Sequence, residues 1–536
     1  MNVTLKFCGA TRTVTGSCYH LSYPGGQGLI DCGMFQGSKT LKELNYGRFP
    51  FKPGDIDFVI LTHAHIDHSG LVPKLIKDGF SGPVYTTSGT YDLLTYLLPD
   101  SGYIHEREVE RLNRRNHQRG KKTVEAIYTR QDGERALENF RTFEYQKWLD
   151  IGPGLRARFW NAGHILGAAS VEIEIVETAA KAEPMRLLFS GDIGPEHKLF
   201  HPDPEAPEHW DYVICESTYG DRPRPFVQPS ERRSQLAEEV HRVLDKNGVL
   251  LIPAFAVERT QELLADLASL LKQGAIPQVP IFLDSPLAIR ATEVFTKHAP
   301  TLNDLGDGGD LMRQPNVHFT ETVDQSKAIH RFSSGIIVMA ASGMCDAGRI
   351  RHHLKKYLPV KSTTVLLVGY QAPATLGSLL AAGVPAVRIQ GEDVKVRADV
   401  RQLDIYSGHA DQKGLVDWIS SRLPISRAVF LTHGEGDAIK GLTDELLGLG
   451  LSKSQILIPE LDDEINLTTQ TWIASPESPA RQIARTGVGR MDWHNELAQL
   501  SLDLREALDA AADEKHRSIL LRRMRRALDN KEDVHL

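Results

Sequence analysis

The chain has 536 residues, of which 24% are charged, and its formal net charge is −7. This length exceeds what a single hydrophobic core usually serves, so two or three domains are expected. The mild negative charge neither requires nor excludes a nucleic-acid partner, because a local groove can be basic within an acidic chain. No apolar run approaches the roughly 20 residues of a membrane span, so no membrane partner is expected.

The first residues alternate apolar and polar side chains, as in Val3, Leu5 and Phe7, and therefore predict a β-strand. This segment shows no apolar signal core, so we expect the protein to be cytoplasmic. The five cysteines are scattered along the chain and form no CxxC pair. An odd, dispersed set of this kind argues against a disulfide framework.

Short β runs separated by turn signals fill the first 200 residues or so, and the clearest are 28–31, 57–61, 83–85 and 185–189. Several of these runs end in a polar residue next to glycine or histidine. The strand ends can therefore deliver ligands into a shared site.

Between about 209 and 385 the pattern changes to apolar strands that alternate with amphipathic helices, which predicts a buried parallel sheet. We expect its strands at 212–215, 249–252, 281–283, 335–339 and 364–368, and helices at 230–247 and 260–273. After about 386 alternating strands return, at 387–389, 394–404 and 428–432.

This order predicts an α/β domain that is interrupted by a second domain and completed by the chain after it. The expected boundaries are 1–208 for the first part, 209–385 for the insert, 386–470 for the returning part and 471–536 for a charged, helical extension.

Four candidate metal ligands follow the apolar strand that ends at Leu61, namely His63, His65, Asp67 and His68. In an extended segment His63 and His65 point the same way, and the next two can face a second point one turn later. Imidazole and carboxylate ligands suit zinc and, less selectively, manganese or iron. The alternative is a histidine-rich loop without a metal, and the spacing after an apolar strand disfavours it.

Further ligands must come from other strand ends or turns. His164 is flanked by Gly163 and Gly167, which permit close approach, and Asp192 follows an apolar strand and could bridge two metal ions. Asp31 is placed to accept a hydrogen bond from a ligand histidine. Each of the three polar residues alone would more often be a turn or capping residue, and their combination with the His63 cluster predicts a site.

In this order, Asp31, segment 63–68, His164 and Asp192 resemble the motif series of the metallo-β-lactamase fold. That fold hosts thioesterases, lactamases, oxidoreductases and nucleases, so the substrate stays open. The later segments resemble the β-CASP subfamily of ribonucleases, and they are 215–220, 253–262, 284–288, 341–344, 407–411 and 432–434. The resemblance covers about residues 1–470. It implies an α/β protein in which a metallo-β-lactamase αββα sandwich is interrupted by a β-CASP parallel-sheet domain, with a C-terminal helical extension.

The resemblance also implies the chemistry, a zinc-dependent ribonuclease that hydrolyses phosphodiester bonds with two metal ions, as an endonuclease, a 5′-exonuclease or both. By this resemblance one zinc is held by His63, His65 and His164, and the other by Asp67, His68 and His433. Asp192 would bridge the two ions, and manganese is an alternative to zinc.

Glu216, His409 and His433 match the family's three β-CASP motifs. His409 is the candidate group that protonates the leaving oxygen, and Glu216 would orient it. The candidate catalytic residues are therefore Asp31, Asp67, Glu216 and His409. Family members that process DNA tend to carry an apolar residue in place of His433, so single-stranded RNA is the implied partner and a DNA-directed nuclease is the alternative.

Ser342, Gly343 and Met344 follow an apolar strand and are candidate substrate contacts. A small, glycine-bearing turn can offer backbone N–H groups to a phosphate, although an ordinary connection is an equal alternative. Between His105 and Arg130 there are eight Lys or Arg against four Glu, which predicts either a border of the substrate groove or a solvated helix face.

The tail, 491–536, has leucines at helical spacing and is expected to dock onto the core or onto a partner subunit, which leaves a homodimer open. Two other functions compete with the ribonuclease, a small-molecule metallohydrolase such as a thioesterase and a metal-bearing but inactive RNA-binding subunit. Glu216 and His409 argue against the first, since a thioesterase needs no such acid. The complete ligand set argues against the second.

Overall fold

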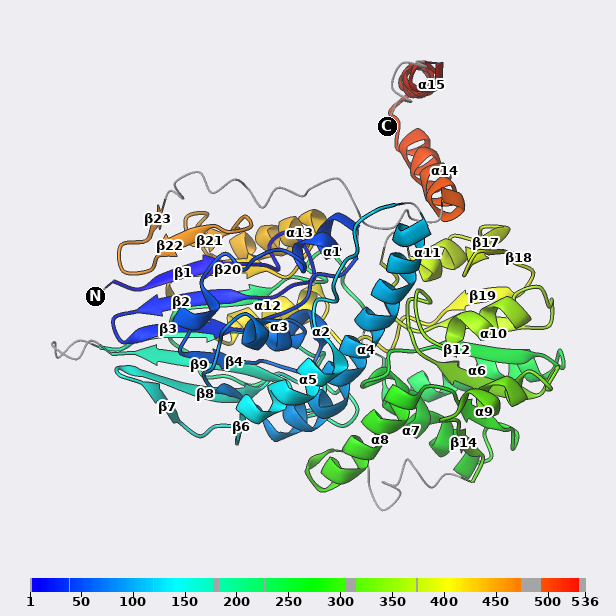
Figure 1. Cartoon of the computed structure of the whole chain (residues 1–536), viewed down its shortest axis with the longest axis horizontal. Helices are drawn as coiled ribbons and strands as arrows, with labels where there is room; N and C mark the ends of the chain where they lie inside the picture. The colour runs from blue at the N-terminus through cyan, green and yellow to red at the C-terminus, as the bar shows by residue number, and fades with distance from the viewer. Residues whose placement is uncertain are drawn as a thin grey trace.

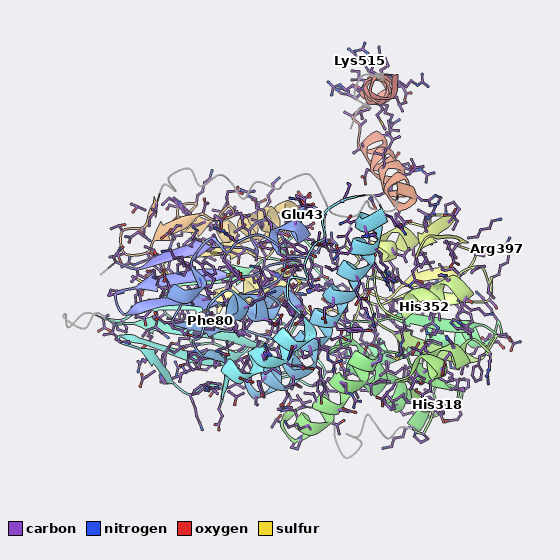
Figure 2. All side chains as sticks on the ribbon, in the orientation of Figure 1. Glu43, Phe80, His318, His352, Arg397 and Lys515 are labelled. Atoms are coloured by element: carbon purple, nitrogen blue, oxygen red, sulfur yellow. The ribbon has the colours of Figure 1, made fainter. Side chains whose placement is uncertain are left out.

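The computed structural model describes residues 2–37, 39–118, 120–176, 183–225, 227–303, 315–372, 375–473 and 493–529. Figure 1 shows two lobes side by side, with two large sheets in the first lobe and a third sheet in the second. The side chains in Figure 2 place Phe80 in the first lobe and His318 and His352 in the second.

The first sheet of the first lobe has eight strands in the order β23-β22-β1-β2-β3-β4-β5-β6. Their bounds are β1 Thr4–Phe7, β2 Tyr19–Tyr23, β3 Gly26–Ile30, β4 Phe58–Ile60, β5 Val84–Thr87, β6 Phe140–Phe143, β22 Glu464–Asn466 and β23 Thr471–Ile473. The helices that connect the early strands are α1 Lys39–Leu44, α2 Ile66–Ser69, α3 Val72–Lys77, α4 Ser88–Gln118 and α5 Arg130–Ala136.

The other sheet of the first lobe has seven strands in the order β21-β20-β11-β10-β9-β8-β7. Their bounds are β7 Leu149–Gly152, β8 Leu155–Asn161, β9 Ala169–Ile175, β10 Met185–Phe189, β11 Trp210–Glu216, β20 Ile425–Thr432 and β21 Ile456–Leu457. Helices α12 Gln412–Ser420 and α13 Gly436–Gly448 join this part of the chain, and Trp418 and Leu442 pack against the apolar residues of β11 and β20.

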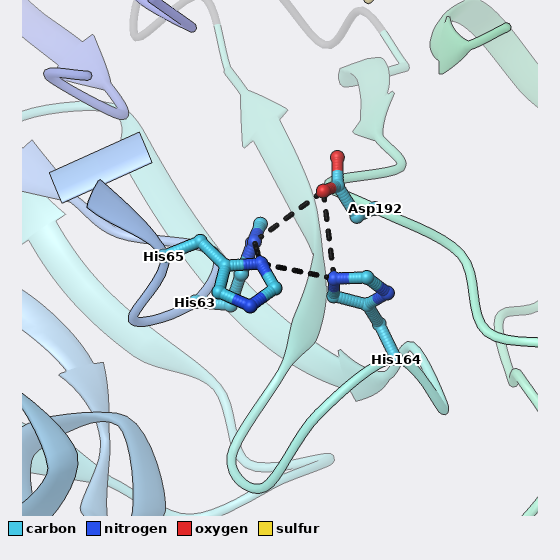
Figure 3. A group of neighbouring side chains, drawn as sticks. All are labelled: His63, His65, His164 and Asp192. Carbon is cyan, nitrogen blue, oxygen red and sulfur yellow. Dashed lines mark hydrogen bonds and ion pairs between the residues drawn. The ribbon is translucent and has the colours of Figure 1, made fainter. Parts of the chain in front are cut away.

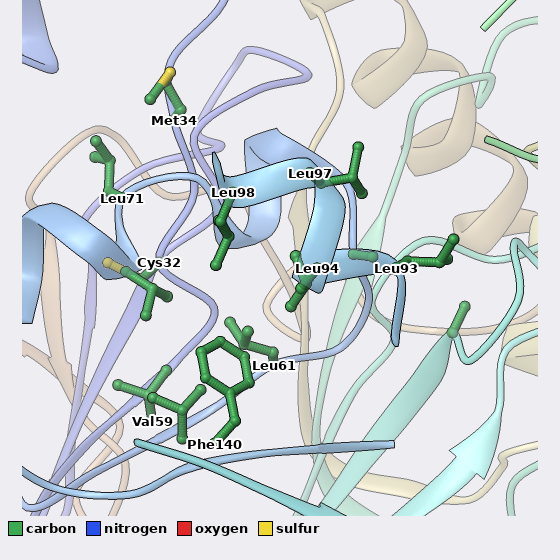
Figure 4. Packing of buried hydrophobic residues seen from close by; sticks show 14 of the residues in the cluster. Cys32, Met34, Val59, Leu61, Leu71, Leu93, Leu94, Leu97, Leu98 and Phe140 are labelled. Atoms are coloured by element: carbon green, nitrogen blue, oxygen red, sulfur yellow. The ribbon is translucent and has the colours of Figure 1, made fainter. Parts of the chain in front are cut away.

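The two sheets of the first lobe pack face to face over an apolar core. Phe7 and Ile60 from the first sheet meet Phe189 and Phe430 from the second sheet in this core. Burial of this apolar area is the main stabilising contribution, about 25 cal/mol for each Å² removed from water. On the opposite face of the first sheet, Figure 4 shows leucines of α4 over Val59 and Leu61. This αββα arrangement confirms the expected fold.

The second lobe, called the inserted lobe below, is built on a parallel sheet in the order β14-β13-β15-β12-β16-β19. Its strands are β12 Val249–Pro253, β13 Ile281–Leu283, β14 Val317–Phe319, β15 Ile336–Ala340, β16 Thr364–Leu367 and β19 Asp399–Gln402. Its helices are α6 Pro229–Leu244, α7 Arg259–Lys272, α8 Pro286–His298, α9 Val323–Ile329, α10 Ile350–Tyr357 and α11 Leu376–Ala381. A separate hairpin joins β17 Ala386–Ile389 to β18 Glu392–Lys395. Apolar clusters cover both faces of the sheet, which explains its near-continuous apolar strands.

Two strands belong to a different sheet from the one expected. The run 212–215 was predicted in the insert, but β11 pairs in parallel with β10 and β20 of the first lobe. The run 394–404 was predicted as a strand of the returning part, but it divides into β18 and β19, and β19 pairs with β16 of the insert. An apolar run predicts a strand without identifying its neighbour, which is why both assignments were wrong. We propose that the insert extends from α6 to β19.

The C-terminal helices are α14 Trp493–Asp509 and α15 Glu514–Asp529, and both project from the inserted lobe in Figure 1. The side-chain amide of Asn495 exchanges two hydrogen bonds with the backbone of Arg388, and Leu502 packs against the insert's apolar cluster. Lys515 of α15 lies apart from both lobes (Figure 2). Parts of the expected C-terminal extension, 474–492 and 530–536, lie outside the described residues. No helix among those described is long and apolar enough to cross a membrane.

Candidate metal centre

The His63 cluster lies where β4 gives way to α2. Strand β4 pairs with β3 and β5, so its end is held in the middle of the sheet. Helix α2 starts directly after His65, which places Asp67 and His68 in its first turn. Gly33 packs so closely that a Cβ there would lie 1.6 Å from the carbonyl oxygen of Asp67, so only glycine permits this contact.

One group of candidate ligands joins His63, His65 and His164 with Asp192 (Figure 3). His65 Nδ1 lies 3.2 Å from His63 Nε2 and 3.1 Å from His164 Nε2. Asp192 Oδ2 lies 3.4 Å from His63 Nε2 and 3.5 Å from His164 Nε2. All of these ligand atoms fall within 4.8 Å of one another, a distance that one cation can bridge.

A second group joins Asp67, His68 and His433. The Nε2 atoms of His68 and His433 are 3.3 Å apart, and Asp67 Oδ2 lies 3.7 Å from His433 Nε2. The other oxygen of Asp192, Oδ1, lies 3.2 Å from His68 Nε2. Asp192 therefore faces both groups, one with each carboxylate oxygen.

Two ring nitrogens that point away from the ligand groups are held by other residues. His68 Nδ1 lies 2.7 Å from Asp31 Oδ2, and His164 Nδ1 lies 2.7 Å from the carbonyl oxygen of Gly408. Asp31 is held in turn by Thr62, whose backbone N–H donates to Oδ1 at 2.8 Å. These contacts fix the rings of His68 and His164 with Nε2 toward the centre, the arrangement in which the other ring nitrogen of a metal-ligating histidine is usually held.

Burial and charge give the site an unusual electrostatic character. Desolvation lowers the pKa values of His63 and His164 well below the usual range, so both rings are neutral and can act as ligands. Burial alone would raise the pKa of Asp192, but the surrounding histidines hold it well below its usual range. Burial likewise opposes protonation of His68, yet Asp192 and Asp31 raise its pKa well above the usual value.

These residues fit a divalent metal cofactor. Oδ1 of Asp192 is buried and accepts no hydrogen bond from any residue that the structure describes. The ring nitrogens of His63, His65 and His164 converge on one space, as ligands do around a shared cation. Asp31 and His433 have left-handed backbones, with φ of 58° and 47°, and such strain in residues other than glycine concentrates at functional sites.

His409 and Glu216 lie beside the first ligand group. His409 Nδ1 is 3.2 Å from Glu216 Oε1, and its Nε2 is 3.9 Å from Asp192 Oδ2. The backbone N–H of Ile193 donates to Glu216 Oε1 at 2.6 Å, so the carboxylate is fixed from the residue after Asp192. The His409 side chain is 20% exposed and that of Glu216 is 1% exposed, so the ring alone is open to a substrate.

The candidate substrate turn, Ser342 to Met344, lies at the end of β15 on the inserted lobe. The backbone N–H of Ser342 donates to Ala347 within the turn. A line of contacts joins the turn to His409. The Tyr219 ring lies 5.9 Å from that of His409 and 6.1 Å from that of Tyr370, and Gln371 beside Tyr370 donates to the carbonyl oxygen of Gly343.

Several contacting residues were not predicted from the sequence. Thr218 Oγ1 lies 3.1 Å from His433 Nδ1, and the Arg224 guanidinium lies 4.1 Å from the Tyr219 ring centroid. Thr218 and Tyr219 belong to the segment 215–220, whose resemblance to a family motif was the available signal. Arg224 carried no comparable signal.

The basic segment, the Lys- and Arg-rich stretch between His105 and Arg130, folds back so that residues 122–124 contact the end of α4. Asn113 exchanges two hydrogen bonds with Val124, and Asn116 donates to the carbonyl oxygen of Lys122. Arg114, Lys121 and Lys122 are exposed. Figure 1 shows that α4, which carries Arg114, runs between the two lobes.

Comparison with known proteins covers most of the chain. The Metallo-beta-lactamase superfamily model matches residues 12–225, the Beta-Casp domain model matches 260–380, and the model of the Zn-dependent metallo-hydrolase RNA specificity domain matches 393–458. The chain is 37% identical to Ribonuclease TTHA0252 of Thermus thermophilus over 440 residues, which cover 81% of this chain and 94% of that protein.

Archaeal relatives and a solved structure extend this picture. Transcription termination factor FttA of Methanosarcina mazei is 31% identical, with 83% of this chain and 69% of that protein covered. FttA of Methanocaldococcus jannaschii is 29% identical, with coverages of 87% and 72%. A crystal structure of a protein of unknown function from Enterococcus faecalis shares the fold alone, with 13% identity, a TM-score of 0.50 and coverages of 87% and 100%.

The fold, the convergence of histidines and carboxylates, and these likenesses agree with one another. The chain is a metal-dependent hydrolase and belongs to the metallo-β-lactamase-fold β-CASP ribonuclease family.

Proposed function

We propose that the protein hydrolyses phosphodiester bonds of single-stranded RNA with two zinc ions. The observation that carries this proposal is the position of Asp192, which faces His63 and His164 with one oxygen and His68 with the other. A carboxylate shared in this way is suited to hold two cations side by side. Such a pair of ions supplies an activated water and neutralises charge on a phosphoryl group.

The protein's own residues would then do the following. His63, His65 and His164 hold one ion, Asp67, His68 and His433 hold the other, and Asp31 orients His68 through its Nδ1. His409 donates a proton to the leaving oxygen, because its exposed ring stands next to Asp192 and imidazole suits acid catalysis near neutral pH. Glu216 keeps that ring in place.

RNA is favoured over other substrates by the neighbourhood of the metal site. Tyr370 and the turn 342–344 of the inserted lobe are connected to His409 through Tyr219 and Gln371. Hydrolysis of a small thioester would not need this second lobe beside the site. A relative over most of the chain is named a ribonuclease, and residues 393–458 match a model described as an RNA specificity domain. A location in the cytoplasm and a homodimer stay predictions from the sequence.

The experiment is cleavage of uniformly labelled RNA that bears a 5′-phosphate, a 5′-triphosphate or a 5′-hydroxyl, with zinc measured on the same sample. We expect two zinc ions per chain and cleavage that stops after chelation and returns when zinc is added. A ladder of internal products would indicate an endonuclease, and loss of label as mononucleotides from 5′-phosphate RNA would indicate a 5′-exonuclease. Intact RNA in the presence of bound zinc would contradict the proposal.

A further inference from the structure

Glu258 is a buried acid at the junction between the two lobes. It directly precedes α7 of the insert, and its side chain is only 4% exposed. Its φ is +70°, a left-handed conformation that residues with a Cβ rarely adopt. The left-handed backbone and the burial of the carboxylate both cost free energy. We therefore expect the carboxylate to make contacts that compensate for this cost.

Those contacts all lead to the other lobe. Oε1 of Glu258 accepts from His201 Nε2 at 2.8 Å and lies 3.1 Å from Lys198 Nζ. Oε2 accepts from the backbone N–H of Leu166 at 3.2 Å. Lys198 and His201 are as buried as Glu258, with side chains 3% and 4% exposed.

The same contacts enclose the turn that carries the candidate ligand His164. Leu166 is two residues beyond His164, and Lys198 Nζ donates to the backbone carbonyl oxygen of His164 itself. Lys198 follows Asp192 on a segment that packs tightly against this turn, since a Cβ on Gly194 would lie 1.8 Å from the carbonyl oxygen of Gly163. One carboxylate from the insert thus binds both the His164 turn and the segment after Asp192.

We propose that Glu258 is a positioning residue, through which the inserted lobe holds the His164 turn in the geometry that binds metal. This role rests on the proposed function, because it requires the metal site described above. It gives the insert a part in metal binding, in addition to its proposed part in contacting RNA.

The test is zinc retention by the full chain during titration with a competing chelator. Two variants are used, because Glu258→Gln leaves the buried Lys198 cation without its partner and can hinder folding. The second is the double substitution Glu258→Gly with Lys198→Met, which removes both charges and suits the left-handed backbone. We expect both to release zinc at chelator concentrations about 10- to 100-fold lower than wild type, the usual effect of removing groups that orient metal ligands.

The control is Asp92→Asn. Asp92 on α4 also links the lobes, through Lys297 and His298 of α8, both at 2.6 Å, and neither of these two partners belongs to the His164 turn. We expect this variant to retain zinc like wild type. Wild-type retention in both Glu258 variants, or equal zinc loss in Asp92→Asn, would overturn the inference. A wild-type chain that takes up no zinc would instead contradict the proposed function.

Discussion

His409 Nδ1 lies 3.2 Å from Oε1 of Glu216, although the two residues are 193 positions apart in the sequence. The Glu216 carboxylate is in turn fixed by the backbone N–H of Ile193, the residue that follows Asp192. Glu216 therefore links His409, the candidate proton donor, to the backbone next to Asp192, whose carboxylate faces both metal-ligand groups. This linkage explains how a ring that is partly open to solvent can keep a defined position beside the site.

Replacing His409 with alanine should abolish proton donation without disturbing the ligands. We expect RNA cleavage by His409→Ala to fall by about 10²- to 10⁴-fold, the typical contribution of general acid–base catalysis. Zinc content, measured by atomic emission, should equal that of wild type. Loss of zinc from this variant would show that His409 is a ligand instead of the acid.

Glu216→Gln should act through His409. We expect Glu216→Gln to reduce the cleavage rate less than His409→Ala does. The double variant that carries both substitutions should be no slower than His409→Ala alone, because residues that act as one unit give non-additive losses. Cleavage rates of the four proteins in this cycle provide the measurement. Additive losses would mean that the two residues act independently.

Asp31→Asn should weaken metal binding without removing a proposed ligand. Asp31 holds His68 through a contact of 2.7 Å, so its loss frees the ring to turn. We expect zinc affinity, measured by chelator competition, to fall by about 10- to 100-fold. Asp57→Asn is the matched control, since Asp57 accepts from the backbone N–H of Gln27 on the same sheet, and its affinity should not change.

His105 should make the fold sensitive to acid. Burial lowers the pKa of this histidine to about 4, and its Nδ1 accepts or donates no hydrogen bond among the described residues. An unfolded chain binds a proton there below about pH 6.5, whereas the folded chain does so only below about pH 4. Acidification through this window therefore lowers the free energy of unfolding, by at most about 1.4 kcal/mol per pH unit.

The measurement is urea unfolding at several pH values. His105→Phe, which keeps an aromatic ring edge-on to Tyr128, should flatten the dependence between pH 6.5 and pH 4. His117→Gln, at an exposed position on the same helix, should leave it unchanged. An equally steep slope in His105→Phe would assign the effect to other groups.

The basic segment should contribute to RNA binding by charge. Neutralising Arg114, Arg115, Lys121 and Lys122 together should weaken RNA binding and reduce the slope of log K against log salt by about 0.7 for each RNA phosphate that these side chains no longer neutralise. Fluorescence anisotropy with single-stranded RNA at several salt concentrations measures both. Neutralising the exposed Arg522, Arg523 and Arg525 of α15 serves as the control. An unchanged slope in the first variant would exclude this segment from the RNA path.

Local sequence patterns predicted the candidate ligands where both the residue types and their spacing were typical of a metal site. Segment 63–68 predicted a metal site by itself, and His164, Asp192 and Asp31 followed from polar residues at strand ends and turns. The structure brings all of them together with His433, Glu216 and His409. Local patterns did not predict which sheet a strand joins, because that depends on strands far away in the sequence. The run 212–215 is equally apolar in either sheet, and only its pairing with β20 shows where it lies.

Glu258 shows a second limit of sequence reasoning. Nothing in its surroundings along the chain indicates a left-handed backbone or a buried carboxylate, and its partners Lys198 and His201 come from the other lobe. Such a contact is decided by how the two lobes dock, so it emerges only from the folded molecule.

The most direct test of the proposed activity is a single comparison of substrates. The zinc-loaded protein is incubated separately with a 5′-labelled single-stranded RNA, a DNA of the same sequence and a thioester, each with and without a chelator. From the proposed function we expect that the RNA is cleaved, that the chelator prevents it, and that the DNA and the thioester are left largely intact. Hydrolysis of the thioester with the RNA intact would contradict the account.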